Sequence, residues 1–108
     1  PVSDIVVTPS FVEPAGGESY PAGSNQVAMW STESITGEAQ NYTGVLYLGY
    51  ATADSTSEHL DISHPLAYGF RLTDGQVEYT IPKNTTVRDT YFLVLVGDSG
   101  NTSPQFSI

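Results

Sequence analysis

The sequence predicts an all-β protein, an antiparallel β-sandwich of about seven short strands that folds without a disulfide. Apolar residues occur in short runs, and several of these runs alternate with polar residues at a period of two, as the two faces of a strand require. Clusters of Gly, Pro, Asn and Asp separate the runs and indicate turns. The chain has 108 residues and no cysteine, so we expect one domain, residues 1–108, with a core stabilised by packing alone.

Seven segments have the composition or the alternation of strands. In chain order they span residues 5–8 with a continuation over 11–14, then 26–31, 43–51, 68–72, 76–81, 91–96 and 105–108. Asp74-Gly75 is the clearest turn dipeptide between them. The glycine-containing stretch 97–101 is predicted as a turn, and the polar stretch 52–65 as a long loop.

Alternation also indicates which side chains point into the core. Val77 and Tyr79 share one face of their segment, and Ala28 and Trp30 share one face of theirs. In residues 91–96 every position is apolar, so the choice of the buried face is open. The predicted core consists of Trp30, Leu46, Leu48, Val77, Tyr79, Leu93, Leu95 and Phe106.

Residues 43–51 and 91–96 are apolar on both faces, whereas a strand of a sandwich needs only one buried face. The second face requires a cover, and three alternatives remain. The loop 52–65 folds over it, a second copy of the chain associates with it, or tyrosines make it a ligand platform. The specific expectation is that residues 60–70 fold back over this face. Four apolar side chains would then cover it: Leu60, Ile62, Leu66 and Phe70.

The absence of cysteine excludes an antibody-type immunoglobulin domain, whose two sheets are joined by a disulfide. An immunoglobulin/fibronectin-like sandwich without this disulfide fits the number of strands. Tyr91 stands at the start of the sixth predicted strand, where such folds carry a tyrosine corner, a tyrosine whose hydroxyl bonds to the backbone upstream. A corner tyrosine and an ordinary core tyrosine both remain open for this position.

Charge argues against two classes of partner. The chain has 12 acidic and 3 basic residues and a formal net charge of −9. Such a surface repels the phosphates of nucleic acids and anionic lipid headgroups. No apolar run reaches the ~18 residues that a membrane span requires. We expect no nucleic-acid partner, no membrane insertion, and a monomer or weak homodimer.

Asparagine-linked glycosylation is predicted because three asparagines begin an Asn-x-Ser/Thr sequon: Asn41, Asn84 and Asn101. All three fall in predicted loops, but Pro104 directly follows the third sequon and makes Asn101 a poor acceptor. The chain opens without a signal-peptide pattern, so either the protein is cytosolic or the numbering begins after a removed signal. The sequons favour the second alternative, a secreted or wall-associated protein that is modified at Asn41 and Asn84.

Side chains that could carry chemistry are sparse. His59 and His64 lie in a predicted loop that also holds Asp54, Glu58 and Asp61, a set that could bind a divalent metal. The loop does not fix the mutual geometry of these side chains. The preferred interpretation is therefore that residues 60–62 anchor the loop to the core through apolar contacts, and not that the loop binds a metal. No catalytic residue, cofactor or metal site is expected.

Three runs in the second half of the chain are similar to the sequences of a known domain family: HPLAYGFRLTDG (64–75), VEYTIP (77–82) and GDSGNTSPQFSI (97–108). Through them the chain resembles the Kre/Knh-type domain, an immunoglobulin-like module of fungal proteins linked to cell-wall β-glucan assembly. Members include Ser/Thr-rich, glycolipid-anchored proteins and small secreted basidiomycete proteins. The resemblance implies a sandwich fold and a secreted or wall-associated protein, and it carries over no catalytic residues. The chain shows no Ser/Thr stalk or hydrophobic tail, which favours a freely secreted form.

The leading expectation is a non-catalytic secreted fungal protein associated with cell-wall β-glucan assembly or organisation. The alternative is a lectin-like carbohydrate-binding module for a fungal or plant wall polysaccharide. Seven tyrosines favour this alternative, because aromatic rings stack on the C–H groups of sugars. The candidate glycan contacts are Tyr47, Tyr50 and Tyr68. An enzyme would require a cleft and a polar constellation that the sequence does not indicate.

Overall fold

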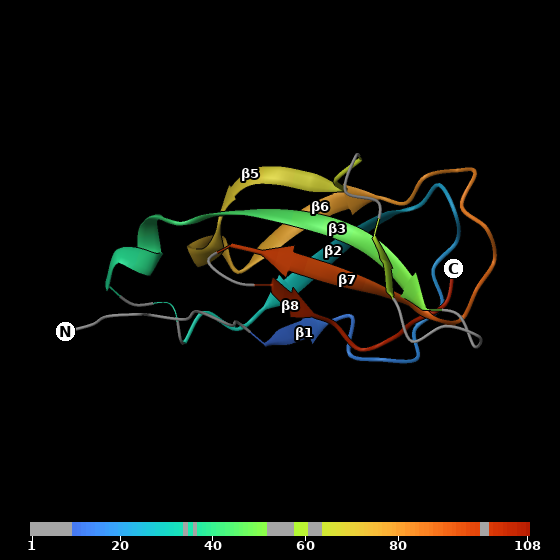
Figure 1. Cartoon of the computed structure of the whole chain (residues 1–108), viewed down its shortest axis with the longest axis horizontal. Helices are drawn as coiled ribbons and strands as arrows, with labels where there is room; N and C mark the ends of the chain where they lie inside the picture. Colours follow the sequence, from blue (N-terminus) through green and yellow to red (C-terminus); the bar gives the residue numbers. More distant parts are fainter. Residues whose placement is uncertain (1–9, 34, 36, 52–57, 61–63, 98–99) are drawn as a thin grey trace.

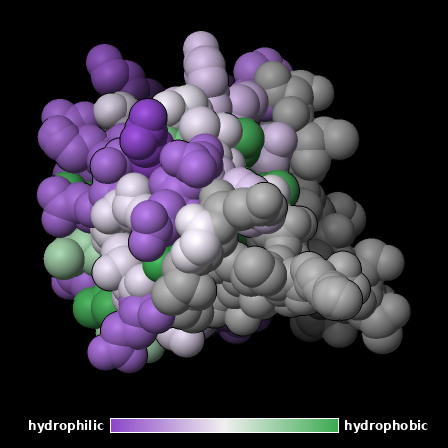
Figure 2. Space-filling view, turned by 90° about the vertical axis from the view of Figure 1, so that its left-hand side faces the viewer, coloured by the Kyte–Doolittle hydropathy of each residue, from purple (hydrophilic) through white to green (hydrophobic). Residues whose placement is uncertain are grey.

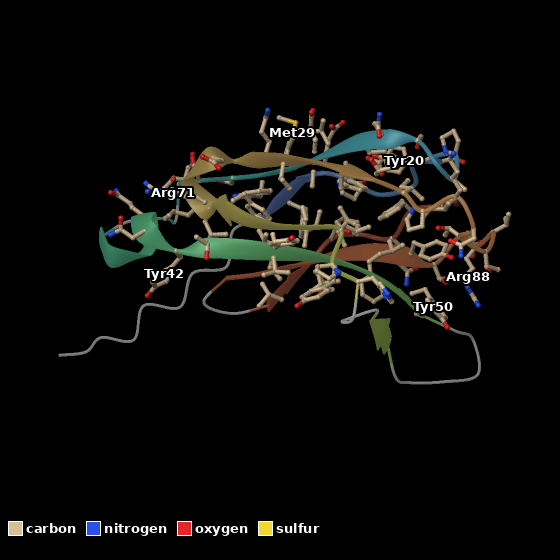
Figure 3. All side chains as sticks on the ribbon, turned by 90° about the horizontal axis from the view of Figure 1, so that it is seen from above. Tyr20, Met29, Tyr42, Tyr50, Arg71 and Arg88 are labelled. Atoms are coloured by element: carbon tan, nitrogen blue, oxygen red, sulfur yellow. The ribbon has the colours of Figure 1, made fainter. Side chains whose placement is uncertain are left out.

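The computed structural model of the chain describes residues 10–33, 35, 37–51, 58–60, 64–97 and 100–108. Two antiparallel β-sheets face each other and enclose one core (Figure 1, Figure 3). The predicted antiparallel β-sandwich is therefore confirmed, and its two sheets are held by packing because the chain has no cysteine.

One sheet has three strands in the order β1-β2-β6. These strands are β1 (Phe11–Glu13), β2 (Asn25–Trp30) and β6 (Gln76–Thr80). Their bounds agree closely with the predicted segments, because the alternation of apolar and polar residues is clear in β2 and β6.

The other sheet has five strands built around the pair β3 (Thr43–Ala51) and β7 (Tyr91–Val96). β8 (Gly100–Thr102) pairs with the second edge of β7. The second edge of β3 is shared by β4 (Glu58–Leu60) and β5 (Ala67–Arg71). Two short 3-10 helices, η1 (Gly37–Asn41) and η2 (Leu72–Asp74), lie at one end of the sandwich (Figure 1). The described surface of that end is mostly hydrophilic (Figure 2).

The strand order is that of an immunoglobulin-like sandwich. β1, β2 and β6 correspond to the first, second and fifth strands of that arrangement, and β3, β7 and β8 to the third, sixth and seventh. β4 and β5 add an outer edge to the second sheet. The immunoglobulin/fibronectin-like arrangement expected from the sequence is therefore present.

Trp30 lies at the centre of the core. It is 3% exposed, and its ring centroid lies 5.5 Å from that of Phe70. Its indole Nε1 donates a buried hydrogen bond of 2.8 Å to the carbonyl of Leu72. Of the other predicted core residues, Leu48 and Val77 are half-buried against the core and the rest are buried. Ile35 is an unpredicted member of the core, because it does not belong to an alternating run.

Tyr91 forms the tyrosine corner. Its ring is buried at the start of β7, and its hydroxyl donates a 2.6 Å hydrogen bond to the carbonyl of Thr86, five residues upstream. This bond ties the connection between β6 and β7 to the core. The corner interpretation, which the sequence left open, is confirmed.

We expect Tyr91→Phe to lower the free energy of unfolding by about 0.5–1.5 kcal/mol, because it removes one hydrogen bond and leaves the ring in place. Urea denaturation followed by circular dichroism measures this loss. Tyr68→Phe is the matched control, since the Tyr68 side chain is 75% exposed, and it should shift stability by less than about 0.5 kcal/mol. Equal stability of the two variants would contradict a stabilising corner.

Three predicted segments differ from the structure. β4 lies in the predicted loop 52–65, and β8 begins in the predicted turn 97–101. Both are three-residue strands that pair through the backbone with an exposed strand edge, so apolar periodicity does not mark them. The predicted strand 105–108 is not part of either sheet. Phe106 pairs with Tyr91 and Ser107 pairs with Ser19, each as an isolated bridge. The predicted strand 5–8 lies outside the described residues.

The outward face of β7 is buried although it points away from the core. Phe92 is 1% exposed and Val94 is 8% exposed, yet neither belongs to the core cluster between the sheets. They pair with Gly49 and Tyr47 of β3. β4 pairs with β3 at the edge of the same sheet. The burial of Phe92 and Val94 shows that both side chains are covered, as the double apolarity of the strand requires.

The predicted composition of that cover is wrong for two of its four residues. Leu66 and Phe70 pack inward against the core cluster, and Phe70 stacks against Trp30. The physical reason is that β5 pairs with β3 as a strand in the same sheet, so its apolar face turns inward with that of β3. The side chain of Leu60 and all of Ile62 lie outside the part that the structure describes.

Candidate functional site

The candidate site is the outer face of the five-stranded sheet. The outer face is defined as seven outward-pointing residues of β3, β5 and β7: Val45, Tyr47, Gly49, Tyr68, Phe92, Val94 and Val96. These seven carry no charge, and the register places one cation beside them, the exposed Arg71 at the end of β5, which pairs with Thr43. Gly49, Phe92 and Val94 are buried, so the accessible part of the outer face is centred on Tyr68.

A β-bulge in β5 determines which aromatic side chains belong to the outer face. Gly44 pairs with Phe70, but the next residue of β3, Val45, pairs with Tyr68, so Gly69 is an extra residue. Gly69 has a φ of 79°, a conformation that glycine adopts without steric cost. In a regular strand Tyr68 and Phe70 would share a face. The bulge instead turns Tyr68 outward while Phe70 stays in the core.

Tyr68 is the one exposed tyrosine, with 75% of its surface accessible, and all seven tyrosines belong to the part that the structure describes. Tyr47 is half-buried on the same face. Because Tyr68 pairs with Val45, Tyr47 is its diagonal neighbour, a separation of about 7–8 Å that aromatic side chains bridge. Two of the three predicted glycan contacts therefore lie together.

Tyr50 does not join them. It lies three residues after Tyr47 on β3 and therefore points to the other face, where its ring is 6.0 Å from that of Tyr91. The guanidinium of Arg88 lies 4.1 Å from the centroid of the Tyr50 ring, a cation–π contact at one end of the sandwich (Figure 3). These contacts give Tyr50 a place in the packing of that end.

The two favoured sequons lie at opposite ends of the molecule. Asn41 is exposed at the end of η1, and Asn84 is exposed in the connection between β6 and β7 (Figure 1). The longest dimension of the chain is 46 Å, so the two acceptor sites are well separated. Asn101 is not in a loop as predicted. It lies in β8, where it pairs with Leu95.

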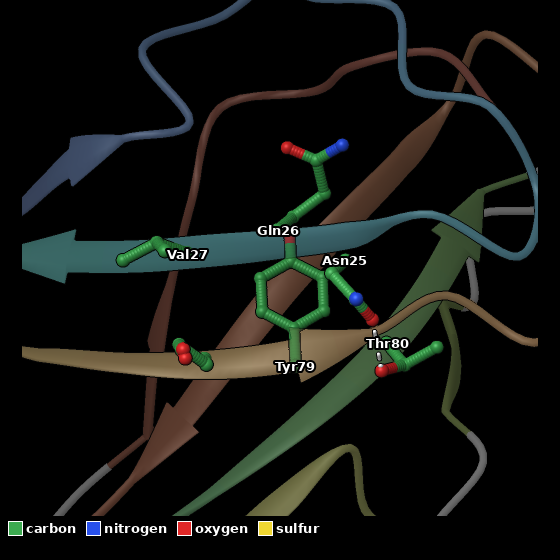
Figure 4. A pocket seen from close by; sticks show the side chains of 6 residues that line it. Asn25, Gln26, Val27, Tyr79 and Thr80 are labelled. Atoms are coloured by element: carbon green, nitrogen blue, oxygen red, sulfur yellow. Dashed lines mark hydrogen bonds between the residues drawn. The ribbon is translucent and has the colours of Figure 1, made fainter.

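A shallow groove of about 320 Å³ lies over β2 and β6 (Figure 4). Across it, the hydroxyl of Thr80 donates a 2.7 Å hydrogen bond to the side-chain carbonyl of Asn25. The lining residues are Asn25, Gln26, Val27, Glu78, Tyr79 and Thr80. The sequence does not indicate this groove, because it predicts Glu78 and Thr80 as an exposed strand face and Tyr79 as a core residue. With Glu78 as its one carboxylate, it lacks the pair of acids that glycoside hydrolysis uses.

Tyr79 contributes a buried hydroxyl that has no hydrogen-bond partner among the described residues. Burial raises the pKa of this phenol, and the neighbouring Tyr20, Glu13 and Glu18 raise it further. The hydroxyl therefore stays protonated at neutral pH, and its side chain lies within the core.

The predicted alternative of a metal site receives no geometric support. His64 is exposed, and the side chains of the other members of that set lie outside the described part of the chain. Within the described residues no three His, Cys, Asp or Glu side chains gather as metal ligands would. No helix among those residues has the length and apolarity to cross a membrane.

Comparison with known proteins adds no relative. No protein-family model, no curated protein and no solved structure matches the chain.

Proposed function

We propose that the chain is a non-catalytic, secreted protein of the fungal cell wall that takes part in the assembly or organisation of β-glucan. The observation that carries this proposal is the exposure of Asn41 and Asn84, both in acceptor sequons. An acceptor asparagine must lie at the surface to be modified in the secretory pathway, and both of these residues do. The resemblance of residues 64–75, 77–82 and 97–108 to the Kre/Knh-type domain supports the same assignment.

Surface charge is consistent with a wall environment. With a formal net charge of −9, the chain is repelled by anionic membranes and nucleic acids but not by uncharged glucan. The role proposed is binding and spacing of polymer chains, which requires no reactive group.

The first test is glycosylation in a eukaryotic secretory host. Mass spectrometry of the secreted protein should show glycans on Asn41 and Asn84, and Asn41→Gln and Asn84→Gln should each remove one of them. Secreted protein that is bare at both sites, from a host that modifies its other secreted proteins, would contradict the extracellular assignment.

The second test is association with the wall. The glycosylated protein should sediment with insoluble β-glucan or with whole wall material and should release no soluble sugar. Release of reducing sugars would identify an enzyme instead. Failure to sediment with glucan, chitin, cellulose and whole walls would reject the proposed function.

A further inference from the structure

We infer that Tyr68 and Tyr47 form a stacking platform for the pyranose rings of a neutral β-glucan chain. This inference rests on the proposed wall function and assigns it a surface and a ligand class. The platform consists of two tyrosines that are diagonal neighbours on the outer face. Tyr50 is not part of it, because its ring packs at one end of the sandwich.

The exposure of Tyr68 is built into the backbone. An aromatic ring that is 75% accessible forgoes the burial that stabilises most tyrosines. If Gly69 were an ordinary paired residue, Tyr68 would point inward on the same face as Phe70, but the bulge at Gly69 turns it outward. Bulges frequently re-aim a side chain next to a functional site. The β-bulge at Gly69 thus exposes the Tyr68 ring to solvent.

The accessible aromatic area fits a sugar chain better than a protein partner. Two tyrosine rings offer at most about 500 Å², and the adjacent Phe92 and Val94 are already buried. A stable protein interface needs about 800 Å² on each partner. Stacking of one or two sugar units needs only the ring faces, whose negative quadrupole attracts the C–H groups of a pyranose.

Charge selects among polysaccharides. Arg71, at the end of β5, is the one charged residue that the β3–β5 register places on the side of Tyr68. The net charge of −9 of the whole chain disfavours an anionic polymer. A neutral glucan loses no ionic hydration on this surface, and the Tyr68 hydroxyl can bond to sugar hydroxyls at the rim. We therefore expect neutral β-glucan to bind more tightly than a carboxymethylated form of the same glucan.

The experiment measures binding of the glycosylated full chain to deproteinised, insoluble β-glucan and to soluble β-glucan. Tyr68→Ala should weaken binding by about tenfold, whereas Tyr68→Phe, which keeps the ring, should stay within about threefold of the original protein. Val87→Ala is the matched control, because Val87 is 86% exposed outside the platform and should bind unchanged. Thermal unfolding should be the same for all three variants, since each changes an exposed side chain.

The outcomes separate this inference from the proposed function. If the original chain binds whole walls and purified glucan but Tyr68→Ala binds equally well, the platform is wrong and the wall function stands. If the chain binds untreated walls but not deproteinised glucan, the ligand is a wall protein and the inference fails. If the chain binds no wall material, the proposed function fails as well. Tyr47→Ala gives a second readout and should weaken binding in the same direction.

Discussion

Replacement of Trp30 by alanine should lower the free energy of unfolding by about 3–5 kcal/mol. Trp30 is 3% exposed and packs against Phe70, so its loss opens a cavity between the sheets. The carbonyl of Leu72 also loses its buried donor, which adds to the penalty. This is a large fraction of the ~5–15 kcal/mol that stabilises a typical domain.

Urea denaturation monitored by circular dichroism measures the Trp30 effect, because the variant lacks the indole fluorophore. Trp30→Phe should recover part of the loss, since it refills most of the volume without restoring the hydrogen bond. Met29→Ala is the neighbouring control on the other face of β2, where the side chain is only half-buried, and it should cost less. A midpoint for Trp30→Ala equal to that of Met29→Ala would remove Trp30 from the centre of the core.

The second large effect is expected at Phe92, on the outward face of β7. Phe92→Ala should also cost about 3–5 kcal/mol, because the side chain is 1% exposed although it points away from the space between the sheets. The variant tests whether the double apolarity of β7 is satisfied by a cover that belongs to the folded chain.

Thr102→Ala is the control for Phe92→Ala. Thr102 pairs with Val94 and is exposed beside the same surface, so its truncation should change stability by less than about 0.5 kcal/mol. The same urea titration serves both variants. A loss at Phe92 as small as that at Thr102 would mean that the ring is open to water in solution.

The strands with regular alternation could be predicted from the sequence, and the short ones could not. β2 and β6 alternate clearly, and the core face of each followed from that pattern. β4 and β8 consist of three residues each. Their pairing depends on the edge that β3 and β7 offer, which exists only once the sheet has formed.

The candidate site was predicted in part. Tyr47 and Tyr68 were named as glycan contacts, and they share the outer face. The prediction of Tyr50 as a third contact is not matched by its position, because its odd spacing from Tyr47 places it on the opposite face of a regular strand. The sequence predicts an unbroken strand over residues 68–72, so the prediction lacks the bulge at Gly69. A glycine between two aromatic residues was the available signal.

The bulge at Gly69 has a consequence for how this surface can change over evolutionary time. The side chain at position 68 is exposed to solvent, whereas the side chain at position 70 packs against the core. Selection for folding therefore restricts position 70 more than position 68. Substitutions at 68 can explore new ring shapes and hydrogen-bonding groups with little effect on folding. The sandwich can therefore diversify what it contacts while its interior stays fixed, in the way that variable loops diversify on a constant framework.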